Sequence, residues 1–308
     1  MKVPNLRIGS STARLPIVQG GMGVRVSLSS LAAAVANEGG IGTISSIGLG
    51  DVKDSESEYE TKSREALVTE IRKARSMTNG ALAVNFMGVL SNVDDLIKAA
   101  VAEGIRIVVF GAGLPVKLPE LVPDPEVSLV PIVSSGRFAS LILKTWEKRF
   151  QRTADAIILE GPLAGGHLGF SVEQLDNADD YALELLLPAL LEAIKPFEDR
   201  FGRKIPVIAA GGIFSGADIA KMLSLGASGV QMGTRFVATH ECDVSPEFKA
   251  AYINAKEDDI VIIKSPVGLP GRAINNAFLK KLEKEVKLRV KCPYHCLTAC
   301  KVETARYC

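Results

Sequence analysis

The residue best suited to acid–base chemistry is His167, one of three histidines in the chain. It stands in the sequence Ala-Gly-Gly-His-Leu-Gly (164–169), directly after a short apolar run at 156–161. The glycines around His167 leave little steric cover over its side chain, and an imidazole titrates near neutrality. Such a side chain suits proton transfer at a substrate carbon. We therefore predict a catalytic or substrate-contacting role for His167, with a structural histidine as the alternative.

Glycines at the ends of two later apolar runs predict a phosphate site. The run 207–212 ends in a Gly-Gly pair, and the run 229–236 contains Gly-Thr. Glycine lets the backbone approach a phosphate closely, and the N–H groups of a turn or a helix N-terminus then become the donors. Two tight strand–helix turns without a ligand are the alternative. The residues of the predicted phosphate site are Gly211, Gly212, Gly233 and Thr234.

A third set of residues could border a flat ring such as isoalloxazine. Such a ring needs backbone without Cβ atoms against its face and polar groups at its edge. The first apolar run, 16–22, leads into Gly-Gly-Met-Gly (20–23), which offers such backbone. Each polar side chain at a strand end is by itself more often a cap, but several at such ends favour a ligand site. These side chains belong to Gln19, Asn85, Ser134, Ser135 and Gln231.

Four of the five cysteines fall in the last seventeen residues, with the spacing C-x3-C-x3-C-x7-C: Cys292, Cys296, Cys300 and Cys308. Clustered thiolates in a reducing compartment suit zinc or an iron–sulfur cluster. The spacing matches neither the usual zinc pairs nor the ferredoxin pattern. A metal site at these cysteines is therefore predicted beside two alternatives, redox-active disulfides and free thiols.

The elements that must position these residues are eight short apolar runs, typical of parallel strands covered on both faces. Helical patterns alternate with them, at 27–36, 64–77, 93–103, 137–150, 181–197 and 216–225. This repeated alternation favours a (β/α)8 TIM barrel, with a doubly wound open sheet as the alternative. In such a barrel the active site lies at the C-terminal strand ends, where the candidate residues stand. The runs are 16–22, 41–46, 82–87, 105–112, 128–135, 156–161, 207–212 and 229–236.

Length and composition set the outer limits of the prediction. The 308 residues are 47% hydrophobic and carry a net charge of +1, which argues against a nucleic-acid binder. No stretch reads as a signal peptide or a membrane span, so we expect a cytoplasmic protein without a membrane partner. We expect one barrel over residues 1–277 and a basic, Cys-rich C-terminal segment over 278–308. Assembly into a homo-oligomer is left open.

Two segments break the strand–helix rhythm. The acidic stretch 48–60 reads as a solvated loop, with a lid over the active site as the alternative. Residues 278–308 hold eight Lys or Arg against three Glu. A solvated helix face with a basic tail explains this charge, and an anionic ligand is the alternative.

The histidine loop, the Gln-Gly-Gly-Met of 19–22, the Ala-Ala-Gly-Gly-Ile of 209–213 and the Gln-Met-Gly-Thr-Arg-Phe of 231–236 together resemble the nitronate monooxygenase family. The close relative of this family, FMN-dependent enoyl-acyl-carrier-protein reductase, shares these motifs. The resemblance covers roughly residues 10 to 275. It is specific in the histidine loop, because the last two motifs also fit the IMP dehydrogenase and dihydroorotate dehydrogenase barrels.

The resemblance implies an FMN-binding barrel with His167 as the catalytic base. The phosphate would lie on the glycine loops named above, and Gly21, Met22 and Asn85 would border the ring. Gln231 would lie on the ribityl or phosphate side. The cofactor-binding residues implied are Gly21, Met22, Gly23, Asn85, Ser134, Gly166, Ala210, Gly211, Gly212, Gln231, Gly233 and Thr234.

The implied reaction is oxidation of an alkyl nitronate with O2 to a carbonyl compound and nitrite. His167 would remove the α-proton of a substrate that arrives as the neutral nitroalkane. The alternatives are an enoyl-thioester reductase that uses NAD(P)H and a flavin-binding electron-carrier or regulatory module. Departures from the family pattern are Leu163, where an acidic residue is usual, the segment 264–273 and the cysteine tail. Arg272 could reach an anionic substrate, with a surface turn arginine as the alternative.

Overall fold

The computed structural model describes residues 3–50, 56–265, 268–284, 295–298 and 300. Eight parallel strands form one sheet in the order β3-β11-β10-β8-β7-β6-β5-β4. The two end strands meet through a parallel bridge between Val18 and Ile41, so the sheet closes on itself. The expected (β/α)8 barrel is confirmed, and the open sheet is wrong. The strands are β3 (Ile17–Gln19), β4 (Gly42–Ser45), β5 (Leu82–Met87), β6 (Ile107–Gly111), β7 (Ser128–Val133), β8 (Ile157–Glu160), β10 (Val207–Ala210) and β11 (Gly229–Met232).

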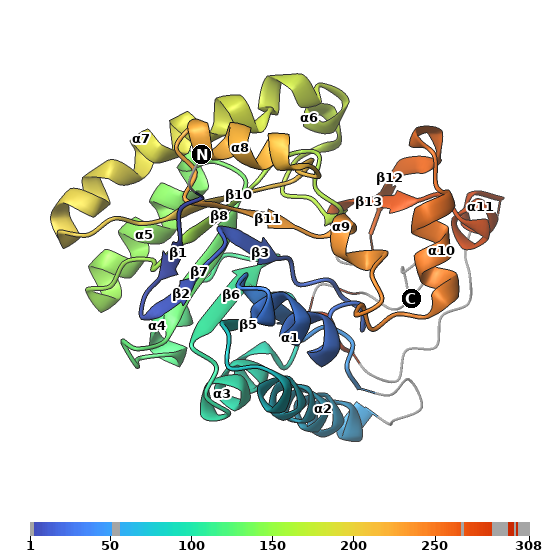
Figure 1. Ribbon diagram of the computed structural model, residues 1–308, viewed down its shortest axis with the longest axis horizontal. Coiled ribbons are helices and arrows are strands. Elements are labelled where there is room, and N and C mark those ends of the chain that lie inside the picture. The colour runs from blue at the N-terminus through green and yellow to red at the C-terminus, as the bar shows by residue number, and fades with distance from the viewer. Residues whose placement is uncertain (1–2, 51–55, 266–267, 285–294, 299, 301–308) are drawn as a thin grey trace.

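Helices follow the strands and cover the outside of the barrel (Figure 1). Serines begin several of them: Ser135, Ser171 and Ser215 each accept a hydrogen bond from a first-turn N–H group. The helices up to the end of the barrel are α1 (Ser29–Asn37), α2 (Glu56–Met77), α3 (Val93–Ala102), α4 (Leu118–Leu121), α5 (Gly136–Phe150), α6 (Val172–Asp176), the 3₁₀ helix η1 (Ala178–Tyr181), α7 (Leu183–Phe201), α8 (Gly216–Ser224) and α9 (Thr234–Val237).

Alternation along each strand divides the core into two layers. In β8, for example, Ile158 points into the barrel, while Ile157 and Leu159 pack outward against helices. A hairpin of β1 (Leu6–Ile8) and β2 (Ser11–Ala13) adds its apolar side chains to the inner layer. The hairpin lies at the start of β7, where the Ser128 hydroxyl donates to the carbonyl of Ile8 (3.4 Å). The N-terminal end of the barrel is thereby covered, and the C-terminal end is left for a site.

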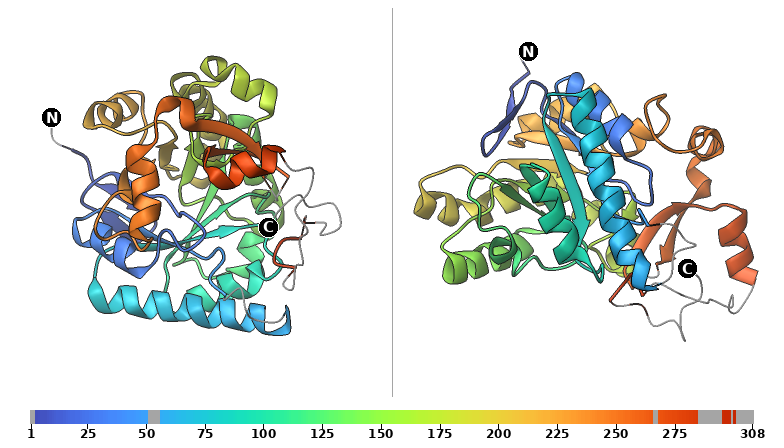
Figure 2. Two further views of the ribbon diagram at one scale, coloured as in Figure 1. Left: turned by 90° about the vertical axis from the view of Figure 1, so that its right-hand side faces the viewer. Right: turned by 90° about the horizontal axis from the view of Figure 1, so that it is seen from below.

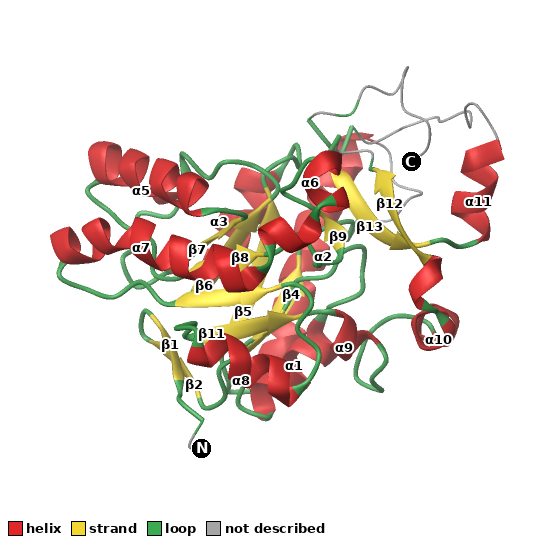
Figure 3. Cartoon of the chain, turned by 90° about the horizontal axis from the view of Figure 1, so that it is seen from above, coloured by secondary structure: helices red, strands yellow, loops and turns green. Residues whose placement is uncertain are grey.

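The chain after the eighth barrel strand builds a small unit beside the barrel mouth. It consists of α10 (Pro246–Asn254), the 3₁₀ helix η2 (Glu257–Asp259), β12 (Ile260–Lys264), β13 (Pro270–Ile274) and α11 (Ala277–Lys284). Strands β12 and β13 pair antiparallel, and β13 also pairs with β9 (Gly166–His167), which belongs to the loop after β8. Figures 1 and 3 both show this sheet with α10 and α11 to one side of the barrel. The last barrel connection therefore returns to the histidine loop.

The sequence located all eight barrel strands but placed one helix start wrongly. Helix α2 begins at Glu56, so the described end of the expected loop 48–60 is helical, and α2 runs as a long helix along the barrel (Figure 2). Residues 51–55, where a lid would lie, are outside the described residues. The domain boundary at 277/278 stays a prediction. Within the described residues, no helix combines the length and apolar character needed to cross a membrane.

Candidate active site

Residues from β3, β5 and β11 meet at the C-terminal mouth of the barrel. A Cβ atom placed on Gly21 would lie 2.3 Å from the Cβ of Asn85, and one placed on Gly233 would lie 3.4 Å from the Sδ of Met22. Gln231 lies beside the same glycine segment. The structure thus brings these five predicted residues together, and only glycine fits where the first loop passes Asn85.

The loops after β10 and β11 supply backbone donors for an anion. Gly211 and Gly212 take the positive φ angles of +100° and +74° that glycine favours. Gly233 begins α9 without any side-chain cap. Within the described part of the chain, the N–H groups of Gly211, Gly212, Gly233 and Thr234 donate no hydrogen bond. Such unsatisfied N–H groups are the donors that a phosphate requires.

Helix α8, in contrast, satisfies its own N-terminus. The carboxylate of Asp218 accepts hydrogen bonds from the N–H groups of Phe214 (3.1 Å) and Ser215 (2.7 Å), which keeps the pKa of Asp218 low. The guanidinium of Arg235 lies 4.5 Å from the centre of the Phe214 ring, so a cation joins the two glycine loops. A phosphate therefore fits on the α9 side of these loops.

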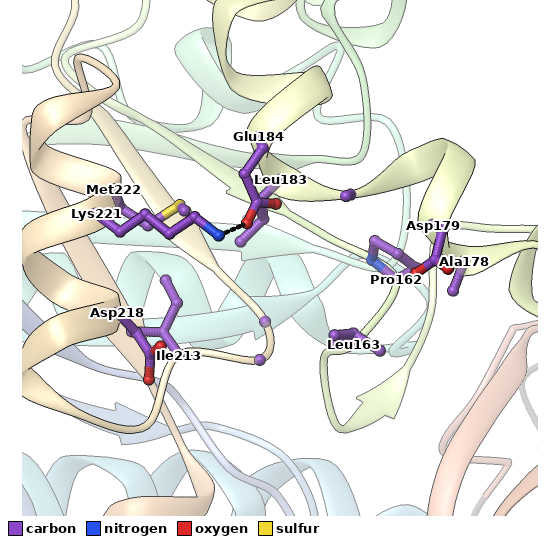
Figure 4. Close-up of a pocket in the computed structure, with 13 residues that line it drawn as sticks. Pro162, Leu163, Ala178, Asp179, Leu183, Glu184, Ile213, Asp218, Lys221 and Met222 are labelled. Carbon is purple, nitrogen blue, oxygen red and sulfur yellow. Dashed lines mark ion pairs between the residues drawn. The ribbon is translucent and has the colours of Figure 1, made fainter.

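A hollow behind the same loops is acidic and does not suit a phosphate. It lies between α7 and α8, beside Leu163 and Gly212 (Figure 4). Four charged side chains line it, and the one cation among them, Lys221, is paired with Glu184. The other two, Asp179 and Asp218, leave an excess of negative charge.

His167 is held at the mouth by the pairing of β9 with β13. It lies opposite Gly271, and the N–H of the following Leu168 donates to the carbonyl of Pro270 (2.9 Å). The side chain is partly buried, and this burial lowers the pKa of His167 below its usual value of 6.5. A neutral imidazole at pH 7 is the form that accepts a proton.

Arg272 does not fit the role of a surface turn arginine. Its Nη1 donates to the carbonyls of Pro162 (2.5 Å) and Ala164 (2.8 Å), in the loop that carries His167. Burial lowers the pKa of Arg272. The guanidinium thus joins β13 to the histidine loop.

Glu160 is a site residue that the sequence did not single out. It ends β8 opposite Ala210, one residue before the histidine loop begins. Burial raises the pKa of Glu160 to about 7. The signal was present in the sequence, since an acid directly after a buried strand lies at the active-site end of a barrel.

Five polar side chains at strand ends or in the loops above them make no hydrogen bond to another described residue: Asn85, Ser134, Glu160, His167 and Gln231. Ser134 lies 3.1 Å from where a Cβ on Gly169 would stand, so it faces the histidine loop. With the four free N–H groups, these side chains fit a ligand that carries a phosphate and a polar ring edge. FMN has both parts.

Other predicted residues have internal partners. Gln19 is fully buried, and its amide bonds the N–H of Thr43 (2.9 Å) and the carbonyl of Gly20 (2.5 Å), so the expectation that it borders a ring is wrong. Ser135 caps α5. Ala210 ends β10, and its carbonyl accepts from the N–H of Gly161 (2.8 Å).

For two further predicted residues the structure shows only protein neighbours. A Cβ on Gly23 would lie 3.0 Å from Ile47, beyond the end of β4. Gly166 is exposed and pairs through its backbone with Arg272. The structure gives Gly166 a place in the β9–β13 sheet, and its contact with a cofactor stays a prediction.

Only half of the predicted metal site can be described. Cys296 and Cys300 are both partly buried, and Cys292 and Cys308 lie outside the described residues. The segment around Cys296 lies along the loop after β5, where its carbonyl accepts from the N–H of Ser91 (3.1 Å). No group of three metal-ligating side chains occurs among the residues that can be described, so zinc or an iron–sulfur cluster stays a prediction.

Comparisons with known proteins agree with this geometry. A family model described as nitronate monooxygenase matches residues 5–306. FabK from Thermotoga maritima superposes with a TM-score of 0.69 at 32% identity over 87% of this chain and 74% of that chain. A nitroalkane oxidase from Streptomyces ansochromogenes superposes with a TM-score of 0.70 at 25% identity, over 87% and 79%.

Curated relatives are longer than this chain. One from Mycobacterium tuberculosis, named (3aS,4S,5R,7aS)-5-hydroxy-7a-methyl-1-oxo-octahydro-1H-indene-4-carboxyl-CoA dehydrogenase, is 30% identical over 274 residues. The match spans 89% of this chain and 67% of that protein. A protein from Staphylococcus aureus, named probable nitronate monooxygenase, is 37% identical over 128 residues, or 42% of this chain and 34% of its own length.

A closed barrel with unsatisfied backbone N–H groups and a histidine at its mouth has the features of a flavin-binding TIM-barrel oxidoreductase. The match over nearly the whole chain shows which one: the chain belongs to the nitronate monooxygenase family. The predicted class, an FMN-dependent oxidoreductase, is confirmed at this level.

Proposed function

We propose that this chain oxidises alkyl nitronates with O2 to a carbonyl compound and nitrite. We also propose that His167 removes the α-proton of neutral nitroalkanes, so that these too are substrates. The observation that carries the proposal is a partly buried imidazole of lowered pKa, held beside a set of unpartnered polar groups at one barrel mouth. A neutral base above a flavin site suits removal of a proton from an acidic carbon.

The chain's own residues would bind and orient the reactants. The N–H groups of Gly211, Gly212, Gly233 and Thr234 would hold the phosphate of FMN, and Asn85 and Gln231 would bond the polar parts of the cofactor. Bound FMN supplies the electron transfer between the nitronate and O2. Electron chemistry thus belongs to the cofactor, and position and proton transfer belong to the protein.

His167 would act on the neutral nitroalkane. One ring nitrogen of the imidazole accepts the α-proton, and the resulting nitronate stays at the barrel mouth. Burial favours this step twice, because it keeps the imidazole neutral and keeps water from competing for the proton. A substrate supplied as the nitronate skips the step.

The experiment is oxygen consumption by the FMN-loaded protein with propionate-3-nitronate, together with nitrite release. Oxygen uptake with stoichiometric nitrite supports the proposal. The matched variant is His167→Ala, which should lose about 10²–10⁴-fold of its rate on a neutral nitroalkane and little on the nitronate. No oxygen uptake with either substrate would refute the proposal.

A second candidate is an FMN-dependent reaction on an acyl thioester, with NAD(P)H as the electron donor. It is favoured by the similarity to the M. tuberculosis protein, which is named for a carboxyl-CoA compound. Oxidation of NADPH coupled to crotonyl-CoA, without nitronate turnover, would establish it. A flavin-binding carrier or regulatory module would instead keep its function in His167→Ala.

A further inference from the structure

Arg272 contacts the histidine loop at two points. From β13 its Nη1 donates to the carbonyls of Pro162 and Ala164, at 2.5 and 2.8 Å. These carbonyls lie between the end of β8 and His167. A guanidinium offers several donors in a fixed plane, so one side chain can hold two carbonyls of one turn.

The two glycines before His167 have no side chains that could hold this part of the loop in place. Apart from their chain neighbours, no atom lies within 4 Å of the place that a Cβ would take on Gly165 or Gly166, and Gly166 has a φ of +73°. Glycine loses more backbone freedom on ordering than other residues. The position of His167 therefore depends on contacts made by its neighbours.

The environment of Arg272 indicates that its hydrogen bonds to the loop are a defined structural contact. The guanidinium is partly buried, its pKa is lowered by that burial, and no carboxylate among the described residues pairs with it. A cation taken out of water against neutral carbonyls is costly unless those hydrogen bonds are made. The β9–β13 pairing next to it fixes the same loop through the backbone.

We propose that Arg272 is a positioning residue that holds His167 over the barrel mouth by clamping the loop 161–166 to β13. This inference rests on the proposed function, in which His167 removes a proton from the neutral nitroalkane. Proton transfer requires the imidazole within hydrogen-bond reach of the carbon acid, and a displacement of about 1 Å can cost about 10²-fold in rate. The clamp therefore matters for nitroalkanes and much less for nitronates.

The test compares Arg272→Met and Arg272→Lys with Arg137→Met in the FMN-loaded protein. Arg137 is an exposed arginine at the start of α5 and serves as the control. Hydrogen exchange of the peptide that contains residues 163–169 reports the clamp without any turnover. Values of kcat and KM with a nitroalkane and with its nitronate report its consequence.

We expect Arg272→Met to exchange about 10-fold faster in this peptide and to lose about 10- to 100-fold in kcat on the nitroalkane. The nitronate rate should stay within about threefold, and Arg272→Lys, which keeps a charge and donors, should recover part of both losses. Unchanged exchange in Arg272→Met would overturn the proposal. If the exchange is unchanged and the KM for the nitronate is also raised, Arg272 binds the substrate anion instead of holding the loop. If the unaltered protein turns over no nitro compound, the proposed function is wrong. The exchange measurement still shows whether Arg272 holds the loop.

Discussion

His167 lies directly opposite Gly271 in an antiparallel pairing, although the two residues belong to the loops that follow different barrel strands. The pairing makes the connection after the eighth strand part of the site formed by the sixth. A barrel presents its loops on one face, and a short sheet between two of them limits how far the histidine loop can move. The mouth is thus shaped by contacts between loops as well as by the barrel.

The pH dependence should follow His167. Burial lowers the pKa of this imidazole below 6.5, and only the neutral form accepts a proton. We therefore expect kcat/KM for a neutral nitroalkane to fall on the acid side with a midpoint below 6.5, and to stay flat from there to neutral pH. A profile measured for the nitroalkane and for the nitronate tests this. A midpoint above 6.5, or one kept in His167→Ala, would contradict the assignment.

The proposed phosphate site at Gly211, Gly212, Gly233 and Thr234 should tolerate little change. Gly211 has a φ of +100°, and a Cβ there would lie 3.0 Å from the N atom of Ala164 and from the carbonyl oxygen of Gly161. Gly211→Ala should therefore lower the flavin content of the purified protein and its stability by about 1–3 kcal/mol. The matched control is Gly216→Ala at the start of α8, where nothing lies within 4 Å. Equal flavin absorbance per protein in both variants would contradict the proposed phosphate site.

The barrel could be predicted from the sequence because each strand is a continuous apolar run. Strand-end residues such as Asn85 and Gln231 followed from that register, since parallel strands end at one face. Gln19 shows the limit of this reasoning. It also ends a strand, but its amide turns inward and bonds Thr43 across the junction that closes the barrel.

The β9–β13 sheet could not be predicted. Strand β9 has two residues, one of them glycine, and its partner is far away in the sequence. Neither periodicity nor propensity signals such a pair. The sequence therefore offers Arg272 only as a substrate contact or a turn residue, whereas the fold shows its hydrogen bonds to the histidine loop.

Asp243, far from helix α1 in the sequence, should stabilise this helix by capping its N-terminus. Helix α1 has no cap of its own, and the Asp243 carboxylate accepts from the N–H groups of Leu28 (2.9 Å) and Leu31 (3.3 Å). Asp243→Ala should cost about 1–2 kcal/mol in the free energy of unfolding, and Asp243→Asn less, because an amide oxygen still caps. Urea unfolding of the unaltered protein, Asp243→Ala and Asp243→Asn measures these differences in the free energy of unfolding. Equal midpoints for Asp243→Ala and the unaltered protein would exclude the cap.

Glu160 should make the protein less stable as the pH rises. Burial raises the pKa of its carboxyl to about 7, against 4.5 for the ordinary group. The folded state therefore holds the proton more tightly than the unfolded state. The contribution of Glu160 to stability is fully present below pH 4.5 and is lost as the pH rises to about 7. Because Glu160 as a residue is only partly buried, we expect the loss to be about 1–3 kcal/mol.

Glu160→Gln keeps the shape of the side chain and removes the titration, so it should abolish this loss. Urea unfolding at pH 5 and pH 8 with excess FMN measures the difference. Glu192→Gln, an exposed carboxylate on α7, is the control and should behave like the unaltered protein. If Glu160→Gln loses as much stability between the two pH values as the control does, the raised pKa is wrong. If only Glu160→Gln stays level, the Glu160 carboxyl keeps its proton in about half of the molecules at pH 7, beside the histidine loop.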